Sequence, residues 1–187
     1  MTPSVDTRLT AIIGTLEHLV LPALAGADPI VQEQAALALG HLRIIRMQLP
    51  HLVTYHLICL NEQLRTGRDL LACAAGGEAT QGAVRALESA MAEAQDRFGD
   101  GSVARDDRNR VAGAIEQLII ASSLDGTPAF IAASQDLLID HGFRQSARDR
   151  AWYGPTGLDP RAASLPSIEA LIAGERGTLQ AGKQASC

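Results

Sequence analysis

Hydrophobic residues recur at intervals of three and four along most of the chain, which is the spacing of amphipathic α-helices. A first helix is predicted to begin near Asp6, whose carboxylate can cap free backbone N–H groups, and to stop at Gly26. Its buried stripe is expected to include Leu9, Ile12, Ile13 and Leu16. Asp28 followed by Pro29 predicts the start of a second helix. The inner face of the second helix is expected to comprise Val31, Ala35, Ala38, Leu42, Ile45 and Leu49.

Pro50 interrupts the apolar pattern, so the chain is expected to break or kink strongly there. Beyond it, residues 51–75 keep a seven-residue repeat and are apolar on every side in their first half, which indicates a central third helix. Gly76 and Gly77 are expected to end that helix. The core is predicted to be dominated by the first, third, fourth and fifth helices, with buried side chains at Leu57, Leu60, Leu64, Leu87 and Met91.

Three more helices follow from the remaining apolar pattern. The fourth is predicted over residues 80–98, with Thr80 as its cap. The fifth is expected to start at Ser102 or Asp106 and to end at Asp125. The sixth is predicted over residues 127–142, because Thr127-Pro128 can open a helix and His141-Gly142 can close one.

The chain beyond the sixth helix offers little packing signal. Glycine and proline crowd residues 152–166, which are expected to be extended, and residues 167–173 can form one short helix before a polar tail. The fold is therefore predicted to be all-α, as a single-domain, up-and-down-type bundle of about six helices. Residues 1–151 are expected to form the bundle, and residues 152–187 an extended C-terminal segment that packs on the bundle or on a partner subunit.

Composition supports helices and excludes several classes of function. Alanine and leucine dominate the apolar residues and only 3% of the chain is aromatic, which favours helix over sheet. A formal net charge of -5 argues against a nucleic-acid binder. The longest stretch without a charged residue, 47–61, is shorter than the roughly 20 residues that cross a bilayer, so no membrane association is expected. The N-terminus lacks a signal-peptide pattern, and the three cysteines form no Cys-x-x-Cys pair, so a cytoplasmic protein with free thiols is expected.

The strongest candidate for chemistry lies on the third predicted helix. His56, Cys59 and Glu62 follow one another at intervals of three, and His51 precedes them, so neighbouring pairs could touch one ion. A zinc or iron site would still need ligands from another helix, and the possible donors are Glu17, Glu33, His41 and His141. The sequence lacks the Glu-x-x-His pairs of di-iron bundles and any His-Glu-x-x-His. We therefore expect no cofactor, with His56 buried, neutral and hydrogen-bonded.

A second candidate is the cluster of basic and aromatic residues beyond the sixth predicted helix. It comprises Arg144, Arg148, Arg150, Trp152 and Tyr153. Guanidinium groups can bind an anion or a partner's carboxylates. Because arginine, tryptophan and tyrosine are enriched at protein interfaces, a docking surface is favoured over a phosphate site.

These observations favour a non-enzymatic accessory or interaction protein that homo-oligomerises, because no catalytic motif is present and the C-terminal segment has little means of folding alone. The alternative is a small-molecule- or metal-binding enzyme whose polar pocket inside the bundle is lined by His51, His56, Cys59 and Glu62. A ligand-sensing transcription factor is disfavoured, because the N-terminal segment is neither basic nor patterned as a helix-turn-helix. Metal analysis of the purified protein separates the first two hypotheses.

Overall fold

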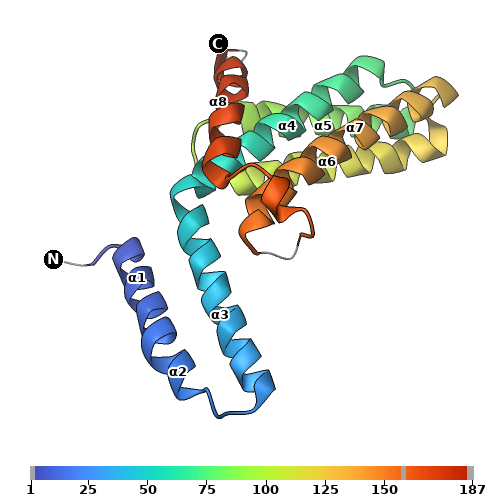
Figure 1. Cartoon of the computed structure of the whole chain (residues 1–187). Helices are drawn as coiled ribbons and strands as arrows, with labels where there is room; N and C mark the ends of the chain where they lie inside the picture. Colours follow the sequence, from blue (N-terminus) through green and yellow to red (C-terminus); the bar gives the residue numbers. More distant parts are fainter. Residues whose placement is uncertain (1–2, 157–158, 185–187) are drawn as a thin grey trace. The chain divides into compact units, whose positions relative to one another are not determined.

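A computed structural model describes residues 3–156 and 159–184 of the chain (Figure 1). These residues are almost entirely helical and form no strand, so the predicted all-α class is confirmed. The chain divides into two compact units. The first unit joins Met1–His51 to Arg150–Ile168, and the second joins Leu52–Asp149 to Glu169–Cys187. Within the described ranges, no helix combines the length and apolar character needed to span a membrane.

The first unit is built on a hairpin of two long helical segments. Helix α1 (Val5–Thr15) continues through a π-helical stretch (Leu16–Val20) into α2 (Leu21–Ala23), and α3 (Pro29–Gln48) returns beside it. The carboxylate of Asp28 accepts the backbone N–H of Ile30 at 2.8 Å, which confirms the predicted cap. Pro50 lies in a 3₁₀ turn (Leu49–His51) that interrupts the helix where the break was expected.

The hairpin does not bury the face of α3 that its sequence pattern marks as inward. Leu39 and Ile44 are the buried residues of α3, whereas Val31 and Ile45 are each 47% exposed. Ile12, expected in the buried stripe of the first helix, is also exposed. The predicted inner face is therefore wrong for α3, whereas the stripe of the first helix is confirmed at Ile13, which is buried.

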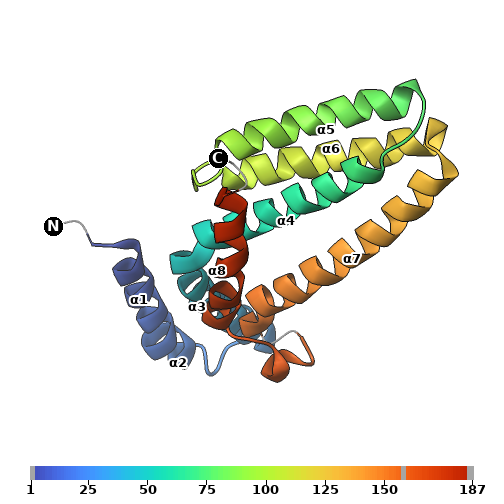
Figure 2. The same cartoon turned by 90° about the horizontal axis from the view of Figure 1, so that it is seen from above.

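The second unit contains an up-and-down arrangement of four helices, α4 (Leu52–Cys73), α5 (Glu78–Asp96), α6 (Ala104–Asp125) and α7 (Pro128–Tyr153), as Figure 2 shows. The last residues of α7 belong to the first unit. Burial of Leu60, Leu64, Leu87 and Met91 in one apolar cluster confirms most of the predicted core. Leu57 is half-buried. Helix α1 belongs to the first unit, whereas all residues of this cluster lie in the second.

The start of α5 is capped from a distant part of the chain. Asp125, at the end of α6, accepts the backbone N–H groups of Ala79 and Thr80 at 2.8 and 3.0 Å. Thr80 was expected to be the cap itself, but its buried hydroxyl donates to Asp125 at 2.6 Å. A side chain at Gly76 would approach the Asp125 carbonyl oxygen to 2.9 Å, so the close contact between these two turns requires glycine.

The C-terminal third of the chain differs most from expectation. Helix α7 passes through Gly142 and ends at Tyr153, where the sequence predicted a stop at residue 142 and extended chain from 152. Two 3₁₀ turns follow (Gly154–Thr156 and Ala162–Ser164), and then α8 (Ile168–Gln184) in place of a short helix and polar tail. One glycine inside a helix costs only about 1 kcal/mol, which the packing of neighbouring turns offsets. Residues 185–187 of the expected tail lie outside the described residues.

Candidate functional site

Polar side chains, rather than leucines, fill the contact between α4 and α7. On α4, Tyr55, Cys59, Glu62 and Thr66 are spaced by four, three and four residues, which places them on one face, and all four are buried. Helix α7 meets this face with its own polar residues at matching intervals, and these are His141, Arg144, Gln145, Arg148 and Asp149. The two helices are therefore joined by a network of charges and hydrogen bonds.

Glu62 is the centre of this network. Its Oε1 lies 2.7 Å from Nη2 of Arg65 and 2.8 Å from Nε of Arg144, and its Oε2 lies 3.5 Å from Nη2 of Arg148. Burial by itself would raise the pKa of this carboxyl, since water is excluded. The polar contacts with His141, Arg65 and Arg144 outweigh burial and hold the pKa of Glu62 well below its usual value. Glu62 is therefore a permanently charged carboxylate at neutral pH.

Arg148 extends the network to the last helix. Only 5% of this residue is exposed. Its Nη1 donates to Oε1 of Gln145 at 2.8 Å, and its Nη2 lies 3.4 Å from Oε1 of Glu175 on α8. Its Nε finds no acceptor among the residues that the structure describes. The buried guanidinium of Arg148, on α7, therefore contacts one carboxylate on α4 and one on α8 and links the three helices.

The other end of the network holds a phenol and a thiol. The hydroxyl of Tyr55 donates to Asp149, which also accepts Nε2 of Gln145 at 2.8 Å. Burial, together with the bond to Asp149, raises the pKa of the Tyr55 hydroxyl. Burial likewise raises the pKa of the Cys59 thiol, although Arg148 works in the opposite direction. Cys59 is therefore a protonated structural thiol and lacks the thiolate that a nucleophile requires.

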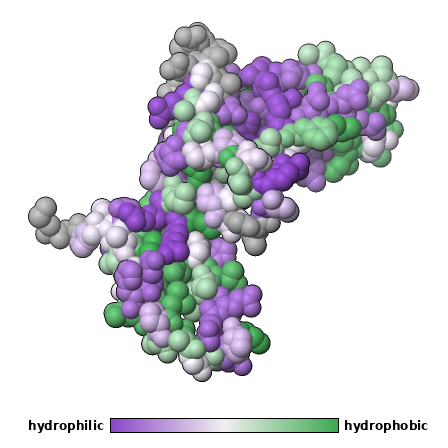
Figure 3. Space-filling view, viewed as in Figure 1, coloured by the Kyte–Doolittle hydropathy of each residue, from purple (hydrophilic) through white to green (hydrophobic). Residues whose placement is uncertain are grey.

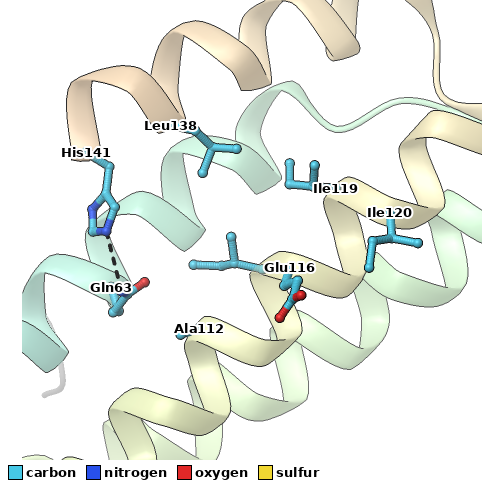
Figure 4. Close-up of a pocket in the computed structure, with 8 residues that line it drawn as sticks. Gln63, Ala112, Glu116, Ile119, Ile120, Leu138 and His141 are labelled. Atoms are coloured by element: carbon cyan, nitrogen blue, oxygen red, sulfur yellow. Dashed lines mark hydrogen bonds between the residues drawn. The ribbon is translucent and has the colours of Figure 1, made fainter. Parts of the chain in front are cut away.

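His141 joins the network to a pocket. Its Nδ1 lies 2.9 Å from the hydroxyl of Thr66 and 3.6 Å from Oε1 of Glu62. The Thr66 hydroxyl donates to the backbone carbonyl of Glu62, so it can accept from His141. Both neighbours favour a proton on Nδ1, which leaves Nε2 as an acceptor for the side-chain amide of Gln63 at 3.4 Å (Figure 4).

The pocket lies between α4, α6 and α7 and has a volume of about 330 Å³. Its walls are mostly aliphatic, with polar groups at one end and one carboxylate on α6 (Figure 4). The residues around it are Gln63, Ala112, Ile115, Glu116, Ile119, Ile120, Leu138 and His141. This composition is typical of a site for a small organic molecule.

The proposed metal ligands do not converge. Glu62 is occupied by arginines, Cys59 contacts Gln145, and His51 belongs to the other compact unit. In the part of the chain that the structure describes, no group of three or more His, Cys, Asp or Glu residues could hold a metal ion.

His56 differs in part from expectation. Burial lowers the pKa of its imidazole, and the nearby charges of Arg108 and Arg105 lower it further, in agreement with a neutral histidine. The expected hydrogen bond is missing at Nδ1, which is buried and has no partner among the described residues. The pocket described above is lined by Gln63 and His141 instead of His56 and Glu62.

The predicted docking cluster is largely used inside the fold. Arg144 and Arg148 bind Glu62 in the second unit, whereas Arg150 pairs with Asp159 at 2.6 Å in the first. Trp152 is buried, and its backbone carbonyl accepts Nε2 of Gln48 at 3.0 Å. Tyr153, which is 55% exposed, is the member that stays open on the surface.

Glu62, Cys59 and His141 were among the candidates from the sequence, whereas Thr66, Gln145 and Glu175, which connect the network, were not. The available signal was the run of polar residues at intervals of three and four after Gly142, which would have required α7 to continue through that glycine. No protein-family model, curated protein or solved structure matches this chain.

Proposed function

We propose that this chain is a non-enzymatic helical interaction protein that self-associates through the hairpin of α1, α2 and α3. The observation that carries the proposal is an apolar face along α3 and the 3₁₀ turn after it. Val31, Ala38, Ile45 and Leu49 on this face are exposed, and Ala35 and Leu42 are half-buried. These positions alternate intervals of four and three over the whole helix, which is the pattern of a heptad seam. A seam of this kind requires facing helices on its apolar side.

Helix α1 carries a similar pattern. Val5, Leu9, Ile12 and Leu16 are spaced by four, three and four residues. Leu9 and Leu16 are half-buried, whereas Val5 and Ile12 are exposed. Both helices of the hairpin therefore leave part of an apolar seam open, and Figure 3 shows hydrophobic surface over this part of the molecule.

The hairpin leaves these seams partly open, because α3 buries Leu39 and Ile44 and leaves Val31 and Ile45 exposed. Two copies of the hairpin supply four helices, which can enclose such seams in a four-helix bundle. Each valine or isoleucine that passes from water into this core contributes up to about 1.5–3 kcal/mol. We therefore propose a homodimer with a four-helix interface.

The polar network supports a binding role over a catalytic one. Glu62 is engaged by three guanidinium groups, and Cys59 is held as a thiol. Each of these groups is committed to holding helices in place. The function proposed for the chain rests on its apolar surface and needs no reactive side chain.

The test compares two alanines of α3 that are both exposed. Ala38 lies on the proposed seam, and Ala36 lies on the opposite side of the helix. The Ala38→Glu variant is expected to have the mass of one chain by light scattering after gel filtration, whereas Ala36→Glu keeps the wild-type dimer mass. Circular dichroism should show equal helix content in both. Equal masses for the two variants would contradict the proposed interface.

A further inference from the structure

The pocket between α4, α6 and α7 lies within the second compact unit and takes no part in the proposed self-association. Its volume of about 330 Å³ falls at the lower end of the range for small-molecule sites, which begins near 300 Å³. Ile115, Ile119 and Leu138 supply its aliphatic walls. A ligand that fits must be small and must bury mainly apolar surface.

The polar end of the pocket offers an acceptor. Because Nδ1 of His141 faces Thr66 and Glu62, its Nε2 accepts the side-chain amide of Gln63. That bond turns the side-chain oxygen of Gln63 toward the pocket (Figure 4). No donor among the described residues bonds to this oxygen. A ligand that donates one hydrogen bond would therefore satisfy this acceptor.

Charged groups of both signs lie near the pocket. Glu116 lines it and would repel an anionic ligand. Behind His141, Arg65 and Arg144 surround the single carboxylate of Glu62 and would repel a cation. A neutral molecule meets neither penalty.

We propose that this pocket binds a small, neutral and mainly apolar molecule that carries one hydroxyl group. The apolar part packs on Ile115, Ile119 and Leu138, and the hydroxyl donates to the Gln63 side-chain oxygen. Nothing in this assignment depends on the oligomeric state of the chain.

Four probes of nearly equal shape test the assignment: benzyl alcohol, toluene, benzylamine and benzoate. Each is titrated into the full chain while methyl NMR signals of isoleucine and leucine are followed. Benzyl alcohol is expected to bind saturably, with a dissociation constant about tenfold lower than those of the other three, which is the effect of one good hydrogen bond. Absence of saturable binding, or benzylamine or benzoate binding as tightly as the alcohol, would overturn the proposal.

Variants locate the binding to this pocket. Leu138→Trp is expected to fill the pocket and abolish binding, whereas Ile139→Trp, at the exposed neighbouring position, leaves it unchanged. Gln63→Leu is expected to weaken benzyl alcohol about tenfold and to leave toluene unaffected. Benzyl alcohol binding that survives both Leu138→Trp and Gln63→Leu would show that the molecule binds elsewhere.

Discussion

Nε of Arg144 on α7 lies 2.8 Å from Oε1 of the buried Glu62 on α4. Arg65 and Arg148 approach the same carboxylate, so the single negative charge of Glu62 is paired with three guanidinium groups. Burying such a group is costly unless its partners are complete, and removing one member leaves the others unpaired. The attachment of α7 to α4 should therefore depend on the charge of Glu62.

The Glu62→Gln variant should lower the free energy of unfolding by about 1.5–3 kcal/mol, the contribution of a hydrogen bond to a charged group. The amide cannot neutralise the buried Arg148. Urea denaturation measures the loss. Glu116→Gln makes the same change of charge at an exposed position and should stay within about 0.5 kcal/mol of wild type. Equal stabilities of the two variants would show that the network is dispensable.

Stability should also depend on pH through Glu62. Its pKa in the folded chain lies below the usual value of 4.5, so the unfolded state takes up its proton first as the pH falls. The stabilisation is complete above the unfolded pKa and declines as the pH falls through it toward the folded pKa. The gap in stability between wild type and Glu62→Gln should narrow from about pH 6 to about pH 3. A gap that stays constant over this interval would argue against the assigned charge.

The cysteines should differ in reactivity. Cys59 is buried and its pKa is raised by burial, whereas Cys73 is half-buried and Cys187 lies outside the described residues. In a Cys187→Ser background, iodoacetamide should modify Cys73 in the native protein and reach Cys59 only after denaturant is added. Peptide mass spectrometry reads both sites. Rapid native modification of Cys59 would mean that α4 and α7 separate readily.

The apolar core of the second unit should be sensitive to truncation on α4. Leu60→Ala is expected to cost about 2–5 kcal/mol, since the side chain is buried in the main apolar cluster. Leu124→Ala on α6, where the leucine is exposed, should change stability by less than about 0.5 kcal/mol. Thermal or urea unfolding measures the stability of both variants. Similar losses of stability would show that the Leu60 side chain of α4 is not part of the core.

The sequence predicted the helices well where apolar spacing and caps agree. Asp28 caps α3 and Pro50 interrupts the helix as expected. The sixth predicted helix ended at residue 142 because Gly142 resembles a C-terminal helix cap. The sequence around this glycine does not show that α7 continues to Tyr153, because the continuation depends on tertiary packing. That error also hid the match between the polar faces of α4 and α7.

Long-range partners explain the other differences. Glu62 could be recognised as a candidate from its spacing, but its engagement by Arg144 depends on which helices are neighbours. The role of Asp125 in capping α5 is invisible in the sequence for the same reason, since the two groups are 45 or more residues apart. The inner face predicted for α3 is wrong for a related reason, because burial of Leu39 and Ile44, and not of Val31 and Ile45, depends on which segments pack against the helix.

The mass of the wild-type protein over a range of concentrations decides whether the chain self-associates. Sedimentation velocity from about 1 to about 50 µM spans the affinities expected of an interface of this kind. We expect a species of two 19.7-kDa chains at the upper end of this range. A single chain at every concentration would contradict self-association and would require the seams of α1 and α3 to be covered within one molecule.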